Sequence, residues 1–264
     1  MLQHTGLFPP FGKRGAMTKE ERYAQLIERV KSTYPVHVDG MTDPEGRQLY
    51  WCEACREINL WTYWQGRGRL SPKILLVGQD WGSPWDDPLM MRKIVAMNRG
   101  EAASYVEGNE SKTDKNLVEL FECIGCDITV PHPELFFTNF VLGYRHHGTS
   151  GGFQRRWADH DSDFFRELAD ILQPQVILCL GRDTTQAVME ALGGKFRCPK
   201  GYNAFLDSQA NPMAAHLPGG AAVQVFALAH CGVYGTMNRS PVKSSRDLSL
   251  QVEDWVRIKP WLRP

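Results

Sequence analysis

A short apolar run that ends in a polar turn constrains this chain more than any other feature. Residues 73–77 are Lys-Ile-Leu-Leu-Val, and Gly78-Gln79-Asp80-Trp81-Gly82 follows directly. Such a run is typical of a strand that is buried on both faces of a parallel sheet. Ligands bind at the carboxyl ends of strands in open α/β sheets, so Asp80 is a candidate for chemistry. The spacing alone supports equally well an Asp80 that only caps the next turn.

Three further apolar runs, at 135–141, 176–181 and 223–230, alternate with segments of helical periodicity. Helices are predicted after the capping-box pair Thr18 and Glu21, and then over 116–124, 157–172, 184–192 and 247–256. Alternating strands and helices indicate an α/β fold, with three α/β/α layers and a central, mainly parallel four-stranded sheet.

Three of the four predicted strands end in a polar side chain, namely Asp80, Asn139 and His230. If the strands are parallel, all three side chains lie at one edge of the sheet, which favours a functional role. The alternative interpretations are a strand-end turn cap for Asn139 and a satisfied buried histidine for His230.

Length and charge bound the remaining choices. The 264 residues suit one α/β domain over 1–264, with an irregular N-terminal arm at about 1–17. Acidic and basic residues balance at 30 each, so any patch that binds nucleic acid must be local. No apolar run approaches the roughly 20 residues of a membrane span, and the N-terminus lacks a signal-peptide pattern. We therefore expect a cytoplasmic monomer that does not bind membranes.

The seven cysteines are an odd number in a chain without a secretory signal, which favours thiols or metal ligands over disulfides. Two pairs, Cys52 with Cys55 and Cys123 with Cys126, have the spacing of zinc knuckles. A structural zinc site is one hypothesis, and unpaired buried thiols are the other.

Four elements in order resemble the uracil-DNA glycosylase superfamily. Residues 78–82 are similar to its first motif, and Thr138-Asn139 is similar to a strand ending in Thr-Asn, with Arg145 following. Residues Pro174 to Gly181 are similar to the superfamily's passage from a helix into a strand. His230 is similar to the histidine that begins its second motif. Each element alone is weak, but the ordered set spans roughly residues 70 to 240 and is more specific.

The resemblance implies a DNA glycosylase that extrudes uracil or a related deaminated base and hydrolyses its N-glycosidic bond, as in base excision repair. No cofactor would be required. Asp80 would place a negative charge near the sugar and orient a water, and neutral His230 would donate to O2 of the leaving base. Gln79 and Asn139 would bind the base, since a carboxamide suits the amide edge of uracil.

Further residues would hold the DNA. Trp85 is the first candidate for an aromatic platform under the base, and Trp81 is the second. Tyr234, Met237 or Arg239, in the predicted loop after His230, would fill the gap that the base leaves. Ordinary loop packing is the alternative for these three residues.

Two departures from the superfamily pattern affect this interpretation. Cys231-Gly232 stands where Pro-Ser usually follows the histidine, and Gly82 stands where some members place a tyrosine that excludes the methyl group of thymine. Trp81 or Trp85 would then have to exclude the methyl group of thymine. Otherwise, the protein would accept a wider or a different set of bases.

The resemblance also bears on cofactors and on rival functions. Some members bind an iron–sulfur cluster, but the further ligand would fall near Gly143, so a cluster is less expected than zinc. One rival is a catalytically weak or inactive DNA-binding member. Another is a nucleoside-processing hydrolase on the same fold, although no phosphate-cradling Gly-x-Gly-x-x-Gly or Walker pattern supports it.

Overall fold

The computed structural model describes most of the sheet and its flanking helices. The described residues are 16–34, 49–50, 65–66, 68–82, 111–145, 154–197, 201–208, 210–242 and 245–262, with only the backbone at 49–50, 81–82 and 144–145.

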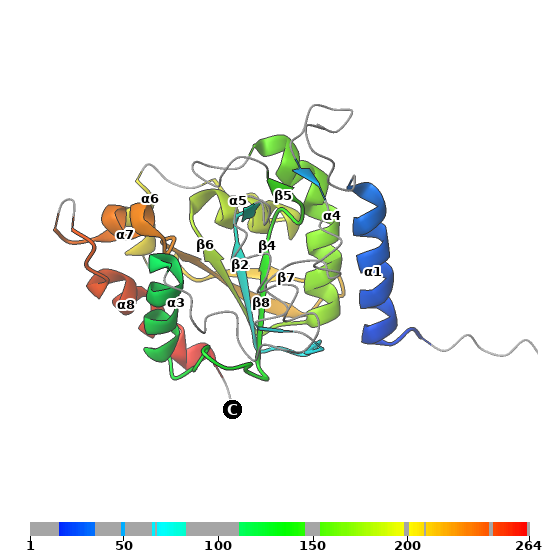
Figure 1. The fold of residues 1–264 in the computed structure, drawn as a ribbon, viewed down its shortest axis with the longest axis horizontal. Helices are drawn as coiled ribbons and strands as arrows, with labels where there is room; N and C mark the ends of the chain where they lie inside the picture. The colour runs from blue at the N-terminus through cyan, green and yellow to red at the C-terminus, as the bar shows by residue number, and fades with distance from the viewer. Residues whose placement is uncertain are drawn as a thin grey trace, which may run out of the picture.

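A five-stranded sheet forms the centre of the molecule (Figure 1). Its strands, in spatial order, are β4 (Leu135–Asn139), β2 (Ile74–Gly78), β6 (Val176–Leu180), β8 (Ala222–Leu228) and β7 (Met213–His216). The first four strands are parallel, as predicted, and β7 is antiparallel to β8 at one edge. The predicted count of four strands was therefore one too few. The edge strand is short and half exposed, so it has no long apolar run to reveal it.

Helices cover both faces of this sheet (Figure 1). One side carries α1 (Lys19–Thr33), α4 (Arg155–Leu172) and α5 (Arg182–Ala191), and the other carries α3 (Lys112–Glu122), α7 (Val233–Arg239) and α8 (Ser249–Val256). The shorter elements are β1 (Leu49–Tyr50), β3 (Trp81–Gly82), β5 (Tyr144–Arg145), α6 (Tyr202–Leu206) and the 3-10 helix η2 (Lys259–Trp261).

Alternation along β2 explains the two cores. Leu75 and Val77 join the apolar cluster under α1 and α4, whereas Ile74 and Leu76 join the cluster under α3 and α8. A strand that is buried on both faces must be apolar throughout, which is why β2 reads as a continuous run.

The helix starts follow local sequence signals to different degrees. The capping box of α1 forms as predicted, because Thr18 Oγ1 accepts from the Glu21 N–H at 3.1 Å and Glu21 Oε2 accepts from the Thr18 N–H at 2.9 Å. Helix α3 begins at Lys112, four residues before the predicted start, and α7 occupies the segment predicted as a loop.

None of the helices in the described part of the chain is long and apolar enough to cross a membrane.

The order of the parallel strands determines where a ligand site is expected. Strand β2 comes first in the chain but lies between β4 and β6, so the connections diverge on either side of it. Ligands in open α/β sheets bind at such a switch point, beyond the carboxyl ends of the strands.

Candidate functional site

The chain segments that follow β2 and β4 stay paired beyond the ends of the strands. Gly78 lies opposite Asn139 in the parallel register. The Phe140 N–H then donates to the Gly78 carbonyl at 3.0 Å, and the Val141 N–H donates to the Gln79 carbonyl at 3.1 Å. Strands β3 and β5 continue this pairing in parallel. The turn that contains Asp80 is thus held by the segment that follows Asn139.

Asn139 lies directly over Gly78. The Asn139 side chain is buried, and a Cβ atom added at Gly78 would lie 2.0 Å from its Oδ1 atom. A glycine is needed here because the carboxamide occupies the space of a side chain, not because the backbone is strained. The sequence indicated only a turn at this position.

A cavity of about 70 Å³ lies at this edge of the sheet. Residues from the ends of all four parallel strands line it, including Gln79, Asn139, Leu180 and His230. Three of the predicted site residues thus meet at one cavity. Asp80 comes directly after Gln79, and its Oδ1 atom lies 3.4 Å from Gln79 Nε2, which places the carboxylate beside this group.

Helix α3 contributes part of the cavity wall, through Thr113, Asp114 and Leu117. Asp114 is buried, and its charge adds to the effect of burial in raising the pKa of the Cys231 thiol to about 12. Sequence reasoning missed Thr113 and Asp114 because the predicted helix began after them. The sequence Ser111-Lys-Thr-Asp, typical of the first turn of a helix, was the available signal.

His230 is held as a neutral ring of one tautomer. Its Nδ1 atom lies 2.9 Å from the backbone nitrogen of Gly232, whose N–H donates to it. Since Nδ1 is the acceptor, the proton of the neutral imidazole sits on Nε2. Burial lowers the pKa of His230 from its ordinary value of 6.5, which favours this neutral form. The site therefore contains an uncharged imidazole that can donate from Nε2.

The backbone around His230 is held by side chains from four helices. The four consecutive carbonyls of residues 228–231 all accept hydrogen bonds from side chains. The donors are the Tyr202 hydroxyl to residue 228 at 2.9 Å, Gln251 Nε2 to residues 229 and 230 at 3.2 Å each, and Asn116 Nδ2 at 2.8 Å with the Thr236 hydroxyl at 3.4 Å to residue 231. These residues were not predicted. Asn116 and Gln251 could have been found as amides on otherwise apolar helix faces.

The three predicted DNA-contact residues after His230 have different environments on α7. The Tyr234 side chain is 78% exposed, which is unusual for a large ring, and Met237 is half-buried. Arg239 is 4% exposed, and its guanidinium faces the interior. The geometry keeps Tyr234 as a candidate and argues against Arg239.

Arg239 forms a buried ion-pair network instead of a surface contact. Its Nε and Nη2 atoms donate to the two carboxylate oxygens of Asp254 at 2.8 Å each, and Nη2 also donates to Asp207 at 2.6 Å. Burial raises the pKa of Asp254 although the nearby guanidinium opposes this effect. Arg239 thus joins α7 to α8, and its buried guanidinium is not placed to fill the gap that an extruded base leaves.

The cysteine pair Cys123 and Cys126 lies in or against the apolar cluster under α3 and α8. Both cysteines are free thiols, and burial raises the pKa of each. No group of three or more potential metal ligands occurs among the residues that the structure describes. Cys52 and Cys55 lie outside those residues, so the zinc hypothesis remains a prediction.

Several other predictions fall on residues with limited description. Trp85 lies outside the described residues, and Trp81 and Arg145 are described by their backbone alone. At Gly143, where an iron–sulfur ligand would fall, an added Cβ atom would lie 2.6 Å from the Tyr34 ring. A cysteine at that position would have to displace this ring.

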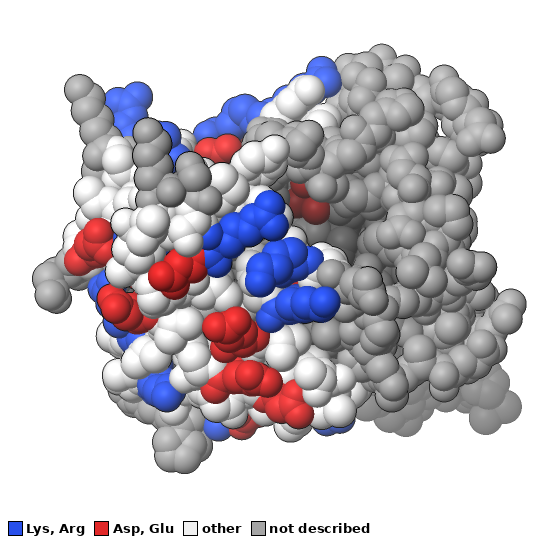
Figure 2. Space-filling model, turned by 60° about the vertical axis from the view of Figure 1, so that its left-hand side comes forward, with Lys and Arg blue, Asp and Glu red and all other residues white. Residues whose placement is uncertain are grey.

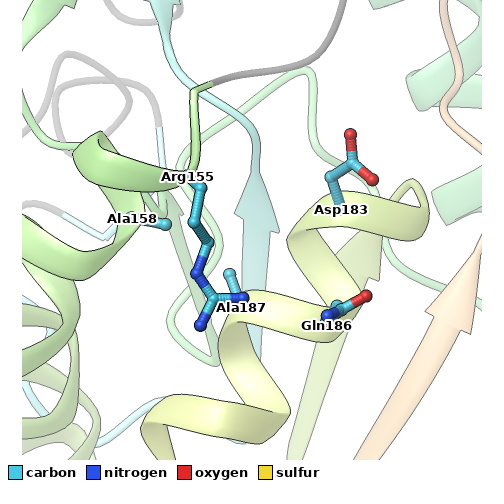
Figure 3. Close-up of a pocket in the computed structure, with 5 residues that line it drawn as sticks. All are labelled: Arg155, Ala158, Asp183, Gln186 and Ala187. Carbon is cyan, nitrogen blue, oxygen red and sulfur yellow. The ribbon is translucent and has the colours of Figure 1, made fainter. Parts of the chain in front are cut away.

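A separate pocket of about 230 Å³ lies between α4 and α5. Figure 3 shows the side chain of Arg155 extending from α4 toward Ala187, while Asp183 and Gln186 lie along α5. The Arg155 guanidinium is paired with the Asp159 carboxylate at 2.9 Å and with the Glu190 carboxylate at 2.7 Å. Because this charge is already balanced and Asp183 adds another carboxylate, the pocket is poorly suited to a phosphate.

The site therefore combines an uncharged imidazole donor, a carboxamide and a nearby carboxylate at the switch point of a parallel sheet. Comparison of the chain with models of protein families found no match, and comparison with curated proteins found none either.

Proposed function

We propose that this protein is a DNA glycosylase of the uracil-DNA glycosylase type, which removes uracil or a related deaminated base from DNA. The observation that carries the proposal is the state of His230, a neutral ring with Nδ1 bonded to the Gly232 N–H, in a cavity that Asn139 also lines. A neutral donor at this place suits a leaving group that departs as a weakly basic anion.

The reaction breaks the bond between C1′ of the deoxyribose and N1 of the base. As the bond lengthens, the sugar gains positive charge and the base gains negative charge, chiefly on O2. Nε2–H of His230 donates to O2, and the Asp80 carboxylate offsets the charge on the sugar and orients the attacking water. The water oxygen forms the new bond to C1′, one water proton goes to Asp80, and the base takes up a proton from solvent.

Asn139 supplies recognition of the base. A carboxamide donates from its nitrogen and accepts at its oxygen, which matches the adjacent O4 and N3–H of uracil. The close approach of Asn139 to Gly78 supports this role, because it fixes the carboxamide in one position. Hypoxanthine presents the similar O6 and N1–H pair, so the base class is defined by this edge.

The surroundings of the cavity support DNA as the polymer. A base must leave the stack to enter a buried cavity, and the exposed ring of Tyr234 on α7 is available to fill the gap. Figure 2 shows Lys and Arg side chains gathered beside a hollow on the side of the molecule that carries α7 and α8, with acidic side chains below them. Such a local basic group suits phosphate contacts in a chain without net charge.

The direct test is excision from labelled oligonucleotides that carry uracil, hypoxanthine, xanthine or a thymine mispair, in single and double strands. We expect release of at least one base, and Asp80→Asn should reduce its rate by two orders of magnitude or more, by analogy with loss of one charge-stabilising group. Failure of the wild-type protein to release any of these bases would refute the proposal. Tight binding without release would indicate an inactive DNA-binding protein instead.

A further inference from the structure

We propose that a second cavity, next to the base cavity, binds the nucleotide adjacent to the extruded one, so that the enzyme reads two successive nucleotides of one strand. This inference rests on the proposed function. The second cavity has a volume of about 570 Å³ and is lined by residues that include Arg182, Tyr202, Asn203, His230 and Asn238. His230 lines both cavities, so they adjoin at the residue that would contact the leaving base.

The volume and the position of the second cavity fit a nucleotide. Cavities that bind small molecules usually enclose about 300–1,000 Å³, and this one falls within that range. It lies at the carboxyl ends of β6 and β8, because Gly181 and Ala229 also line it. When the target base enters the first cavity, the DNA strand continues on both sides of that nucleotide. One of its two neighbours can therefore lie at the second cavity, and the other lies on the far side of the first cavity.

Tyr202 provides an aromatic surface in the second cavity. Its hydroxyl donates to the Leu228 carbonyl at 2.9 Å and lies 3.2 Å from the Thr185 hydroxyl oxygen. These contacts fix the ring at the wall of the cavity, where the residue is only partly buried. A fixed ring beside a DNA path is a stacking platform for a base, because every base has a π-face.

Polar and positively charged residues also line the second cavity. Asn203 Nδ2 donates to the Asn238 carbonyl at 2.7 Å, which ties α6 to α7 across the cavity. Asn203 and Asn238 both line the cavity, so polar groups lie where the edge of a stacked base would be. Arg182 begins α5, is exposed, and lines the same cavity, so its charge is available for the phosphate that joins the two nucleotides. A ring, polar groups and a cation, with no carboxylate among the described lining residues, match a nucleotide.

The experiment measures coupling between Tyr202 and a neighbouring base. Single-stranded oligonucleotides carry the base that the wild-type protein excises, and the nucleotide on its 5′ or its 3′ side is replaced in turn by an abasic spacer. We expect the spacer on one side to lower kcat/KM of the wild-type protein on the order of tenfold, and the spacer on the other side to have little effect. In Tyr202→Ala that difference should vanish, whereas Tyr202→Phe, which keeps the ring, should retain it.

The ratio of the two substrates removes any effect of Tyr202→Ala on folding, because each protein is compared with itself. Equal rates on both spacer substrates for the wild-type protein would overturn the inference while leaving the proposed function intact. The inference would also be overturned if Tyr202→Ala kept the full difference in kcat/KM between the two spacer substrates. If the wild-type protein excised no base from any oligonucleotide, the proposed function would fail, and this inference would fail with it.

Discussion

The backbone N–H of Gly232 donates to Nδ1 of His230 at 2.9 Å, and this bond determines which ring nitrogen carries the proton. The donor belongs to the main chain, and the absence of a side chain at Gly232 leaves room for this close approach. The uncharged donor at His230 therefore needs no side-chain group from position 232. An added Cβ atom at Gly232 would in fact lie 2.9 Å from Nδ1.

The first prediction concerns the protonation of His230. Since burial lowers its pKa below 6.5, the unfolded chain takes up a proton near that pH while the native ring stays neutral. The free energy of unfolding should therefore decrease as the pH falls from about 6.5 through the lower pKa of the folded state. Urea unfolding at a series of pH values measures this, with His230→Gln as the control in which this contribution is lost. An unchanged slope in His230→Gln would contradict the prediction.

The second prediction tests the contact between Gly78 and Asn139. Gly78→Ala should destabilise the protein by about 1–3 kcal/mol, because the new methyl group would overlap Asn139 Oδ1. The same substitution in an Asn139→Ala background should cost much less, since the next nearest heavy atom outside residue 139 is the Thr138 carbonyl oxygen at 3.8 Å. Urea denaturation of the four proteins measures this coupling. Equal costs in both backgrounds would show that the two groups are not in contact.

The third prediction concerns Tyr234 as the residue that fills the gap in the duplex. Tyr234→Ala should change the free energy of unfolding by less than about 0.5 kcal/mol, since the side chain is mostly exposed. Excision from duplex DNA should fall more than excision from single strands, where no stack has to be opened. Val242→Ala, at another exposed apolar residue, is the matched control and should alter neither substrate. Equal losses on both substrates would exclude this role for Tyr234.

The fourth prediction separates a structural from a DNA-binding role for Arg239. Arg239→Ala should destabilise the protein by about 3–5 kcal/mol, because Asp254 would be left buried without its partner. The double variant Arg239→Leu with Asp254→Leu should recover much of this loss, since it removes both buried charges and the remaining partner, Asp207, is exposed to solvent. The salt dependence of DNA binding in that double variant should match the wild type. A salt slope smaller by about one unit would instead indicate a phosphate contact.

The layers of the fold and the edge of the sheet that carries the site could be predicted from local sequence. Strands buried on both faces must be apolar without interruption, so β2, β4, β6 and β8 were visible as runs. Asn139 and His230 stood out because a polar side chain ends each run. Strand β7 was missed because an edge strand needs no long apolar run. Helix α6 was missed because its five residues are too few to show a helical periodicity.

The sequence by itself determined the order of the elements and the residue types at the strand ends, because both depend on short-range periodicity. Only the tertiary structure decided what each side chain does. It buried Arg239 in a helix beside two aspartates, although the sequence predicted a loop there in which Arg239 could contact DNA. It also set the tautomer of His230 and brought Asn116 and Gln251 to the adjacent carbonyls. These properties depend on groups that are distant in the chain, and only folding brings such groups within hydrogen-bonding distance.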